Sequence, residues 1–153
     1  MSQSRTLFGR PQDTDLVTVD RAIAEFRAAR PVLLRAGETL ALAMSAELSE
    51  PGLVARLDTL AQGHGYLILS AARLRRIGAK GRTETGVFAM PTIDPSRVET
   101  LAMKTDAKMD APVAPAGEID TAALELARLS LVVPAVIMVP VTAEAIAGEP
   151  LVI

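Results

Sequence analysis

The chain has 153 residues, half of them hydrophobic and 22% charged, which is the composition of one ordinary domain with a packed core. A net charge of −2, with three phenylalanines and one tyrosine, argues against nucleic-acid binding by a basic surface or a base-stacking platform. The absence of cysteine excludes disulfides and thiolate metal sites, and a single histidine, His64, excludes metal sites with several histidine ligands. No apolar stretch approaches the roughly 18 residues of a membrane helix, and the polar start lacks the apolar core of a secretory signal. We therefore expect a soluble, cytoplasmic protein without a membrane partner.

The first two structural units are a helix and a hairpin. Val19, Ile23 and Phe26 recur at helical spacing with charged residues between them, which predicts a helix over 18–29 that stops before the next proline. The following segment, 31–46, contains two apolar runs separated by an Ala-Gly turn. This pattern predicts a β-hairpin.

Short helices and strands alternate through the rest of the chain. The expected elements are, in order, a helix opened by Ser49, Glu50 and Pro51, a strand over 66–69, a helix over 71–77, a strand over 87–90, a helix capped by Asp94 and ending near 103, a loop over 104–117, a helix capped by Asp120, and a strand over 134–139. This alternation predicts an α/β (α+β) sandwich, with helices packed on the faces of a mixed sheet.

Two ends flank this expected domain. We interpret residues 1–14 as a flexible N-terminal arm, because they are polar and lack apolar periodicity, and 15–153 as a single domain. The chain ends at 149–153 with Glu149 followed by four apolar residues. Such an end is typical either of a domain truncated at this point or of a last strand paired into the sheet.

His64 is one candidate ligand-binding residue. It lies between two glycines ahead of a buried strand, where a histidine can act as an exposed general base or contact a phosphate. The alternative is a polar loop residue without a chemical role. We favour this alternative, because the sequence offers His64 no visible partner.

Five basic residues crowd into ten positions. They are Arg73, Arg75, Arg76, Lys80 and Arg82. Such a cluster can bind a phosphate, and Arg73, Arg75 and Arg76 join His64 as weak ligand-binding candidates. Basic side chains at a helix C-terminus also complement the helix dipole and stay in water. We favour the second explanation, because no glycine-rich phosphate loop accompanies the cluster.

Carboxylates give no clear catalytic pattern. Glu38, Glu47 and Glu50 lie near the hairpin and could bind magnesium as a group, but positions at a strand end and in a helix first turn explain Glu47 and Glu50. The motifs of nucleotide-binding loops, zinc proteases and serine hydrolases are absent. The residues therefore predict no catalytic site, no metal site and no cofactor.

Three stretches in order resemble 3,4-dihydroxy-2-butanone 4-phosphate synthase, an enzyme of riboflavin biosynthesis. RAIAEFRAARPVLL (21–34), with LALAMSAELSEPGLVARL (40–57), is similar to the family's first helix and strand and its passage into the next helix. GHGYLILSAARLRRIG (63–78) is similar to a glycine-bounded strand followed by a helix. IDTAALELARLSLVVPAVIMVPV (119–141) is similar to the family's last helix and strand. The resemblance implies the synthase fold and a homodimer.

The chain departs from this family at the positions that the resemblance implies are catalytic. The family's long acidic loop, which supplies magnesium ligands, corresponds here to the short segment 35–39, with Glu38 as its one acid. The family's metal-binding histidine falls at or beside Ile119, and the following glutamate falls at Thr121. The family reaction rearranges ribulose 5-phosphate with loss of formate, and needs a divalent ion together with acids and bases. We therefore interpret the chain as a degenerate, non-catalytic member.

A domain of this kind also occurs fused ahead of GTP cyclohydrolase II. This leads us to expect a structural, dimerising N-terminal part of a GTP cyclohydrolase II-type protein. One alternative is a small-molecule module that binds a phosphorylated ligand through His64 and the basic cluster. A third is a divergent lyase that acts on ribulose 5-phosphate with a relocated site.

Overall fold

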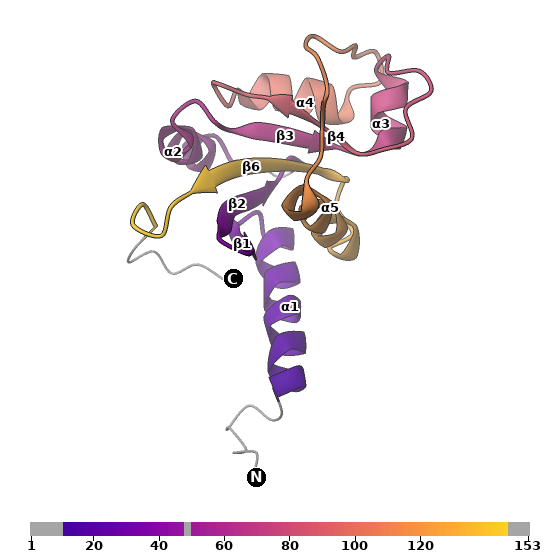
Figure 1. Cartoon of the computed structure of the whole chain (residues 1–153). Coiled ribbons are helices and arrows are strands. Elements are labelled where there is room, and N and C mark those ends of the chain that lie inside the picture. Colours follow the sequence, from indigo (N-terminus) through magenta and orange to yellow (C-terminus); the bar gives the residue numbers. More distant parts are fainter. Residues whose placement is uncertain (1–10, 48–49, 147–153) are drawn as a thin grey trace.

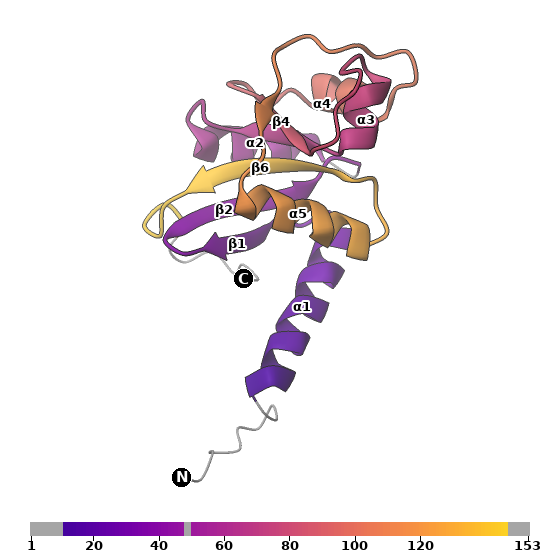
Figure 2. The same cartoon turned by 45° about the vertical axis from the view of Figure 1, so that its right-hand side comes forward.

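A six-stranded antiparallel sheet with helices on both faces forms the protein, as seen in a computed structural model that describes residues 11–47 and 50–146 (Figures 1 and 2). The strand order is β1-β2-β6-β3-β4-β5. The elements are α1 (Pro11–Arg27), β1 (Val32–Ala36), β2 (Thr39–Ser45), α2 (Pro51–Ala61), β3 (Tyr66–Leu69), α3 (Ala71–Arg76), β4 (Gly86–Ala89), α4 (Pro95–Met103), β5 (Ala114–Pro115), α5 (Glu118–Leu129) and β6 (Ala135–Val141). The predicted α+β sandwich is confirmed.

The sheet itself differs from the expected mixed sheet. Every pairing between the described strands is antiparallel, including both pairings of the last strand, β6. β6 inserts between β2 and β3, with Val139 opposite Leu42 and Ile137 opposite Leu67. Two hairpin-like units are thereby joined through one central strand, and no parallel crossover is needed.

The central strand explains why its sequence is continuously apolar. The first five residues of β6 are buried, and both faces of the sheet are covered by helices. On one face, Phe88 and Met44 pack with residues of α2, α3 and α4. On the other, Phe26 of α1 packs with α5 and with Met138 of β6. A strand covered on both faces reads as an apolar run rather than as an alternating one.

Several element boundaries differ from the sequence-based predictions. α1 begins at Pro11 and ends at Arg27, because proline fits the first helical position, where no N–H partner is required. Residues 1–10 of the expected arm, Ser49 of the expected cap and the chain end at 149–153 lie outside the described residues. The N-cap of α2 is Glu50, and its side chain makes no capping hydrogen bond. The expected loop over 104–117 contains β5, which pairs with β4.

The remaining helix starts agree more closely with the sequence. Asp94 caps α4 as predicted, since its side chain accepts a hydrogen bond from the Ser96 N–H at 3.0 Å. α5 begins at Glu118, so Asp120 is its third residue rather than its cap. None of the helices in the described part of the chain is long and apolar enough to cross a membrane.

Candidate functional site

His64 and the three arginines lie at opposite ends of β3. His64 precedes this strand, whereas Arg73, Arg75 and Arg76 belong to α3, which follows it. A four-residue strand spans roughly 13 Å, and the helix adds to that separation. The structure therefore does not bring His64 and the arginines together in one recess.

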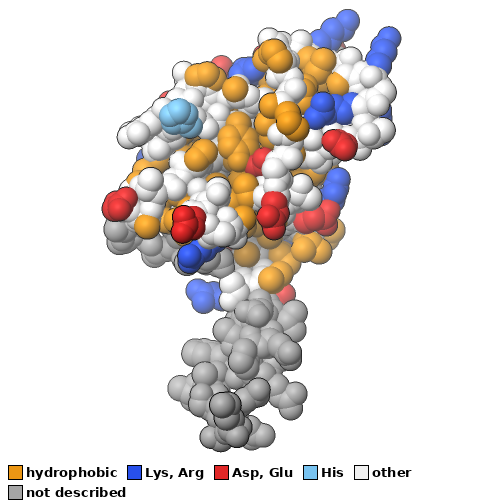
Figure 3. Space-filling model, in the orientation of Figure 1, with side chains coloured by type: hydrophobic (Ala, Val, Ile, Leu, Met, Phe, Trp, Pro, Cys, Tyr) orange, Lys and Arg blue, Asp and Glu red, His pale blue; other side chains and the backbone are white. Residues whose placement is uncertain are grey.

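His64 lies at the end of the sheet where β6 finishes. Its exposed side chain, visible on the surface in Figure 3, lines a recess of about 280 Å³ together with Gln62, Pro140 and Thr142. The His64 N–H donates a hydrogen bond to the Ala61 carbonyl at 2.9 Å, which closes the end of α2. The recess thus contains one imidazole, one amide and one hydroxyl as its polar side chains.

Arg73 holds the end of α4. Its guanidinium donates hydrogen bonds to the carbonyls of Leu101, Thr100 and Lys104, at 2.8, 3.1 and 2.7 Å. These carbonyls lie at a helix C-terminus, where the last carbonyls need partners from outside the helix; the Thr100 carbonyl also accepts from the Lys104 N–H at 3.3 Å. Burial lowers the pKa of the Arg73 guanidinium, and the positive charge of Arg76 lowers it further. The hydrogen bonds of Arg73 are therefore directed to the backbone and hold α3 against α4.

Arg75 and Arg76 border a different recess, of about 320 Å³. Its other charged side chains come from the loop after α3 and from the loop after α4: they are Lys80, Asp106 and Lys108. Arg75 also donates to the Arg82 carbonyl at 2.8 Å, so it fixes the loop that carries Lys80. Two of the predicted candidates thus share one basic recess with Lys80, a member of the same sequence cluster, and with Asp106 and Lys108, which lie outside that cluster.

The positions compared with the family's metal ligands do not fit a divalent ion. Ile119 packs its apolar side chain against the core under α5, and the Thr121 hydroxyl donates to the Gly117 carbonyl at 3.2 Å. Glu38 lies in the exposed turn of the first hairpin, and Glu47 accepts a hydrogen bond from the Val133 N–H at 2.7 Å. Across 11–47 and 50–146, no three histidine, aspartate or glutamate side chains form a group that could hold a metal. The expected absence of metal and cofactor stays a prediction.

A buried polar pair escaped the sequence analysis. The Tyr66 hydroxyl at the start of β3 donates to Asp120 Oδ1 at 2.5 Å, and Asp120 Oδ2 accepts from the Gly117 N–H at 2.8 Å. Burial raises the pKa of Tyr66, as do the hydrogen bond to Asp120 and the charge of that carboxylate. The position of Asp120 in a helix first turn signalled a backbone contact. Nothing in the sequence signalled a tyrosine partner 54 residues away.

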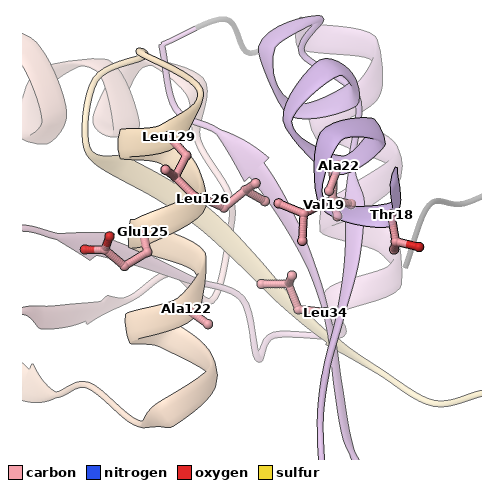
Figure 4. Close-up of a pocket in the computed structure, with 9 residues that line it drawn as sticks. Thr18, Val19, Ala22, Leu34, Ala122, Glu125, Leu126 and Leu129 are labelled. Atoms are coloured by element: carbon pink, nitrogen blue, oxygen red, sulfur yellow. The ribbon is translucent and has the colours of Figure 1, made fainter. Parts of the chain in front are cut away.

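An apolar groove lies between α1 and α5, beside the point where the two helices pack together. It has a volume of about 320 Å³, and β1 forms its floor (Figure 4). Val19 and Ala22 of α1, Leu34 of β1, and Leu126 and Leu129 of α5 point toward this space. Val19 is 45% exposed and Leu129 is 56% exposed, which is unusual for large apolar side chains that lie together. No sequence pattern indicated this groove, because it depends on how α1 and α5 pack on the sheet.

Comparison with known proteins identifies the fold. In sequence, no protein-family model and no curated protein matches the chain. In structure, a two-domain 3,4-dihydroxy-2-butanone 4-phosphate synthase from A. baumannii matches with a TM-score of 0.59 and 17% identity, over 80% of this chain and 47% of that one. The Candida albicans synthase matches with a TM-score of 0.59 and 17% identity, over 88% and 83% of the two chains. A cation-free synthase matches with a TM-score of 0.61 and 14% identity, over 80% and 74%.

These matches establish the fold. The chain has a 3,4-dihydroxy-2-butanone 4-phosphate synthase-like fold, as the sequence resemblance implied. It spans about half the length of the two-domain synthase. Identities of 14–17% leave the chemistry to be argued from this chain's own residues.

Proposed function

We propose that the chain is a non-catalytic synthase-like domain that pairs with a second copy of itself through the groove between α1 and α5. The exposed apolar lining of this groove is the observation that carries the proposal. The fold alone is compatible with catalysis, so the proposal depends on two further arguments, one about the former metal positions and one about the groove.

The first argument concerns the chemistry of the metal positions. A divalent ion that polarises neighbouring oxygens needs oxygen or imidazole ligands. At the compared positions this chain has the packed side chain of Ile119, the hydroxyl of Thr121, which donates to the Gly117 carbonyl, and a tight turn at Gly37, whose φ is +62°. A turn this short presents Glu38 as a single exposed carboxylate. This arrangement supports a non-catalytic role.

The second argument concerns the groove. Val19 and Leu129 face the same open space, and Leu131, just beyond α5, is 86% exposed. Burying such side chains against a partner releases about 25 cal/mol for each Å² of apolar surface removed from water. A second copy offers the same apolar surface, and a two-fold interface is the commonest arrangement of homo-oligomers. Glu125 and Arg128 form an ion pair on α5 at 2.7 Å and would form the polar rim.

The proposal extends to the protein in which the domain acts. We place it as the structural N-terminal part of a GTP cyclohydrolase II-type riboflavin biosynthesis protein in the cytoplasm. The likeness to about half of a two-domain synthase supports a role as one part of a larger protein. The mass of the native polypeptide, measured by immunoblot against this domain, tests that placement: a mass well above 16.1 kDa supports it and a mass of 16.1 kDa contradicts it.

Sedimentation of the purified chain tests the interface. We expect the wild-type chain to sediment as a dimer and Leu129→Asp to sediment as a monomer, because the new carboxylate would be buried without a partner. Ala55→Asp, which adds the same carboxylate on the exposed side of α2, is the matched control and should leave the dimer intact. A monomeric wild type, or equal dissociation by both variants, would contradict the proposed interface.

An activity assay tests the non-catalytic role separately. Ribulose 5-phosphate and magnesium are incubated with the chain, and released formate is measured. We expect no formate above the protein-free control. Turnover would instead favour the divergent lyase, whatever the oligomeric state.

A further inference from the structure

The recess beside α3 concentrates positive charge in a chain that is negative overall. Four cations, Arg75, Arg76, Lys80 and Lys108, and one carboxylate, Asp106, line it, a local charge of +3 against −2 for the whole chain. The ion pairs among the described residues involve other arginines, so no carboxylate within 4.0 Å neutralises any of these four cations. Like charges brought together repel one another, and an anion between them relieves that repulsion.

The helix dipole does not account for this convergence. Arg75 and Arg76 lie in the last turn of α3, where cations are stabilised by the dipole. Lys80 lies four residues beyond that helix, and Lys108 comes from the loop after α4, a segment that is remote in sequence. Their presence in the same recess needs a different explanation.

Hydrogen bonds hold the two walls of the recess in place. The guanidinium of Arg73 binds three carbonyls at the end of α4, and the Met109 N–H donates to the Ile77 carbonyl at 2.9 Å. Arg75 fixes the loop after α3 through the Arg82 carbonyl. The cations therefore converge on a framework that exists before any ligand binds, which reduces the entropic cost of binding.

We propose that this recess binds the phosphate group of a small phosphorylated molecule. Arg76, Lys80 and Lys108 would supply the charged donors, and the planar guanidinium of Arg76 suits bidentate contact with two phosphate oxygens. The volume of about 320 Å³ is at the lower end for small-molecule sites, which matches a compact ligand. The site is independent of the groove between α1 and α5, which shares none of its lining residues.

Two of the original candidates are excluded from this site. Arg73 uses its guanidinium to hold α4, and His64 lies at the other end of β3. Lys108 takes their place as the donor from the second wall. The phosphate chemistry expected of the basic cluster is thereby assigned to a different set of side chains.

Calorimetric titration of the whole chain with glycerol 3-phosphate tests this assignment, with glycerol and inorganic phosphate as the comparison ligands. We expect saturable binding of both phosphates and none of glycerol. Arg76→Gln and Lys108→Gln should each weaken binding by about tenfold, as expected for the loss of one charge-assisted hydrogen bond. Both residues are exposed, so thermal unfolding of the variants should match that of the wild type.

Lys104→Gln is the matched control. Lys104 is exposed at the end of α4 and does not line the recess. The substitution therefore removes one positive charge from the same region without changing the lining of the recess. Binding should be unchanged in this variant. Absence of saturable phosphate binding, equal weakening by Lys104→Gln, or binding of glycerol as tight as that of glycerol 3-phosphate would overturn the proposal. Tighter binding of a single-stranded polynucleotide than of glycerol 3-phosphate would overturn the assignment to a small ligand.

Discussion

The ionisation of Tyr66 at alkaline pH can be observed directly in this protein. Tyr66 is the single tyrosine, and the chain has no tryptophan, so the near-ultraviolet phenolate signal comes from one side chain. Burial raises the pKa of Tyr66, and the hydrogen bond and negative charge of Asp120 raise it further. In the folded protein we therefore expect Tyr66 to remain protonated through pH 10, where an unfolded tyrosine ionises.

The same shift predicts how stability depends on pH. Above about pH 10 the unfolded chain releases the phenol proton while the folded chain keeps it, so the folded state binds more protons and stability falls as pH rises. For one proton the loss is at most about 1.4 kcal/mol per pH unit, and it ends when pH reaches the folded pKa. At neutral pH, Tyr66→Phe should lower the free energy of unfolding by about 1.5–3 kcal/mol, because the buried carboxylate of Asp120 loses the hydrogen bond that the Tyr66 hydroxyl donates.

Two measurements check this reasoning. Absorbance of the phenolate is followed during an alkaline titration, and urea unfolding is measured over the same range for the wild type and Tyr66→Phe. The two proteins differ only at position 66, so the difference between their stabilities isolates the tyrosine. We expect absorbance to rise only as the wild type unfolds, and the stability difference between the proteins to shrink above pH 10. A normal titration near pH 10 with the fold intact would refute the buried pair.

Three further predictions concern packing and an exposed ion pair. Phe88→Ala removes a fully buried ring and should destabilise the fold by about 3–5 kcal/mol in urea unfolding, whereas a loss below about 1 kcal/mol would contradict its place in the core. Gly86→Ala would place a methyl group against Val113 and should lower stability by about 1–3 kcal/mol; an unchanged urea midpoint would show that β5 is not held this closely. The bidentate hydrogen bond from Arg97 lowers the pKa of Asp110. This ion pair therefore stabilises the fold above the pKa that Asp110 has in the unfolded chain, and the stabilisation is lost as pH falls through the pKa of Asp110 in the folded protein. Arg97→Gln should move the Asp110 pKa, measured by NMR, upward to its ordinary value, and no change would contradict the pairing.

Local patterns were sufficient to predict the elements. The spacing of Val19, Ile23 and Phe26 predicted a helix, the Ala-Gly turn predicted the first hairpin, and Asp94 with Pro95 predicted the start of α4. Each of these depends on residues that are neighbours in the chain, where helical period and capping act. The antiparallel direction of β6 depended on pairing between distant strands, so no local pattern indicated it.

The candidate site shows the same division more sharply. The sequence identified Arg75 and Arg76 as potential phosphate ligands from their crowding, but it grouped them with His64. The strand predicted over 66–69 already lay between His64 and these arginines, and the structure shows that β3 keeps them in different recesses. Only the fold brings Lys108 to the side of Arg75 and Arg76. Charge density can be read along a chain, whereas convergence on one recess depends on long-range packing.

The sequence by itself determined the kind of fold: alternating helices and strands, without cysteine, with a resemblance confirmed at the level of the fold. Tertiary structure alone decided which surfaces remain available for function. Val19 and Leu129 are 110 residues apart, and each belongs to an ordinary amphipathic helix. α1 and α5 pack on one face of the sheet but do not cover all of its apolar surface. Both side chains therefore stay exposed beside the same groove.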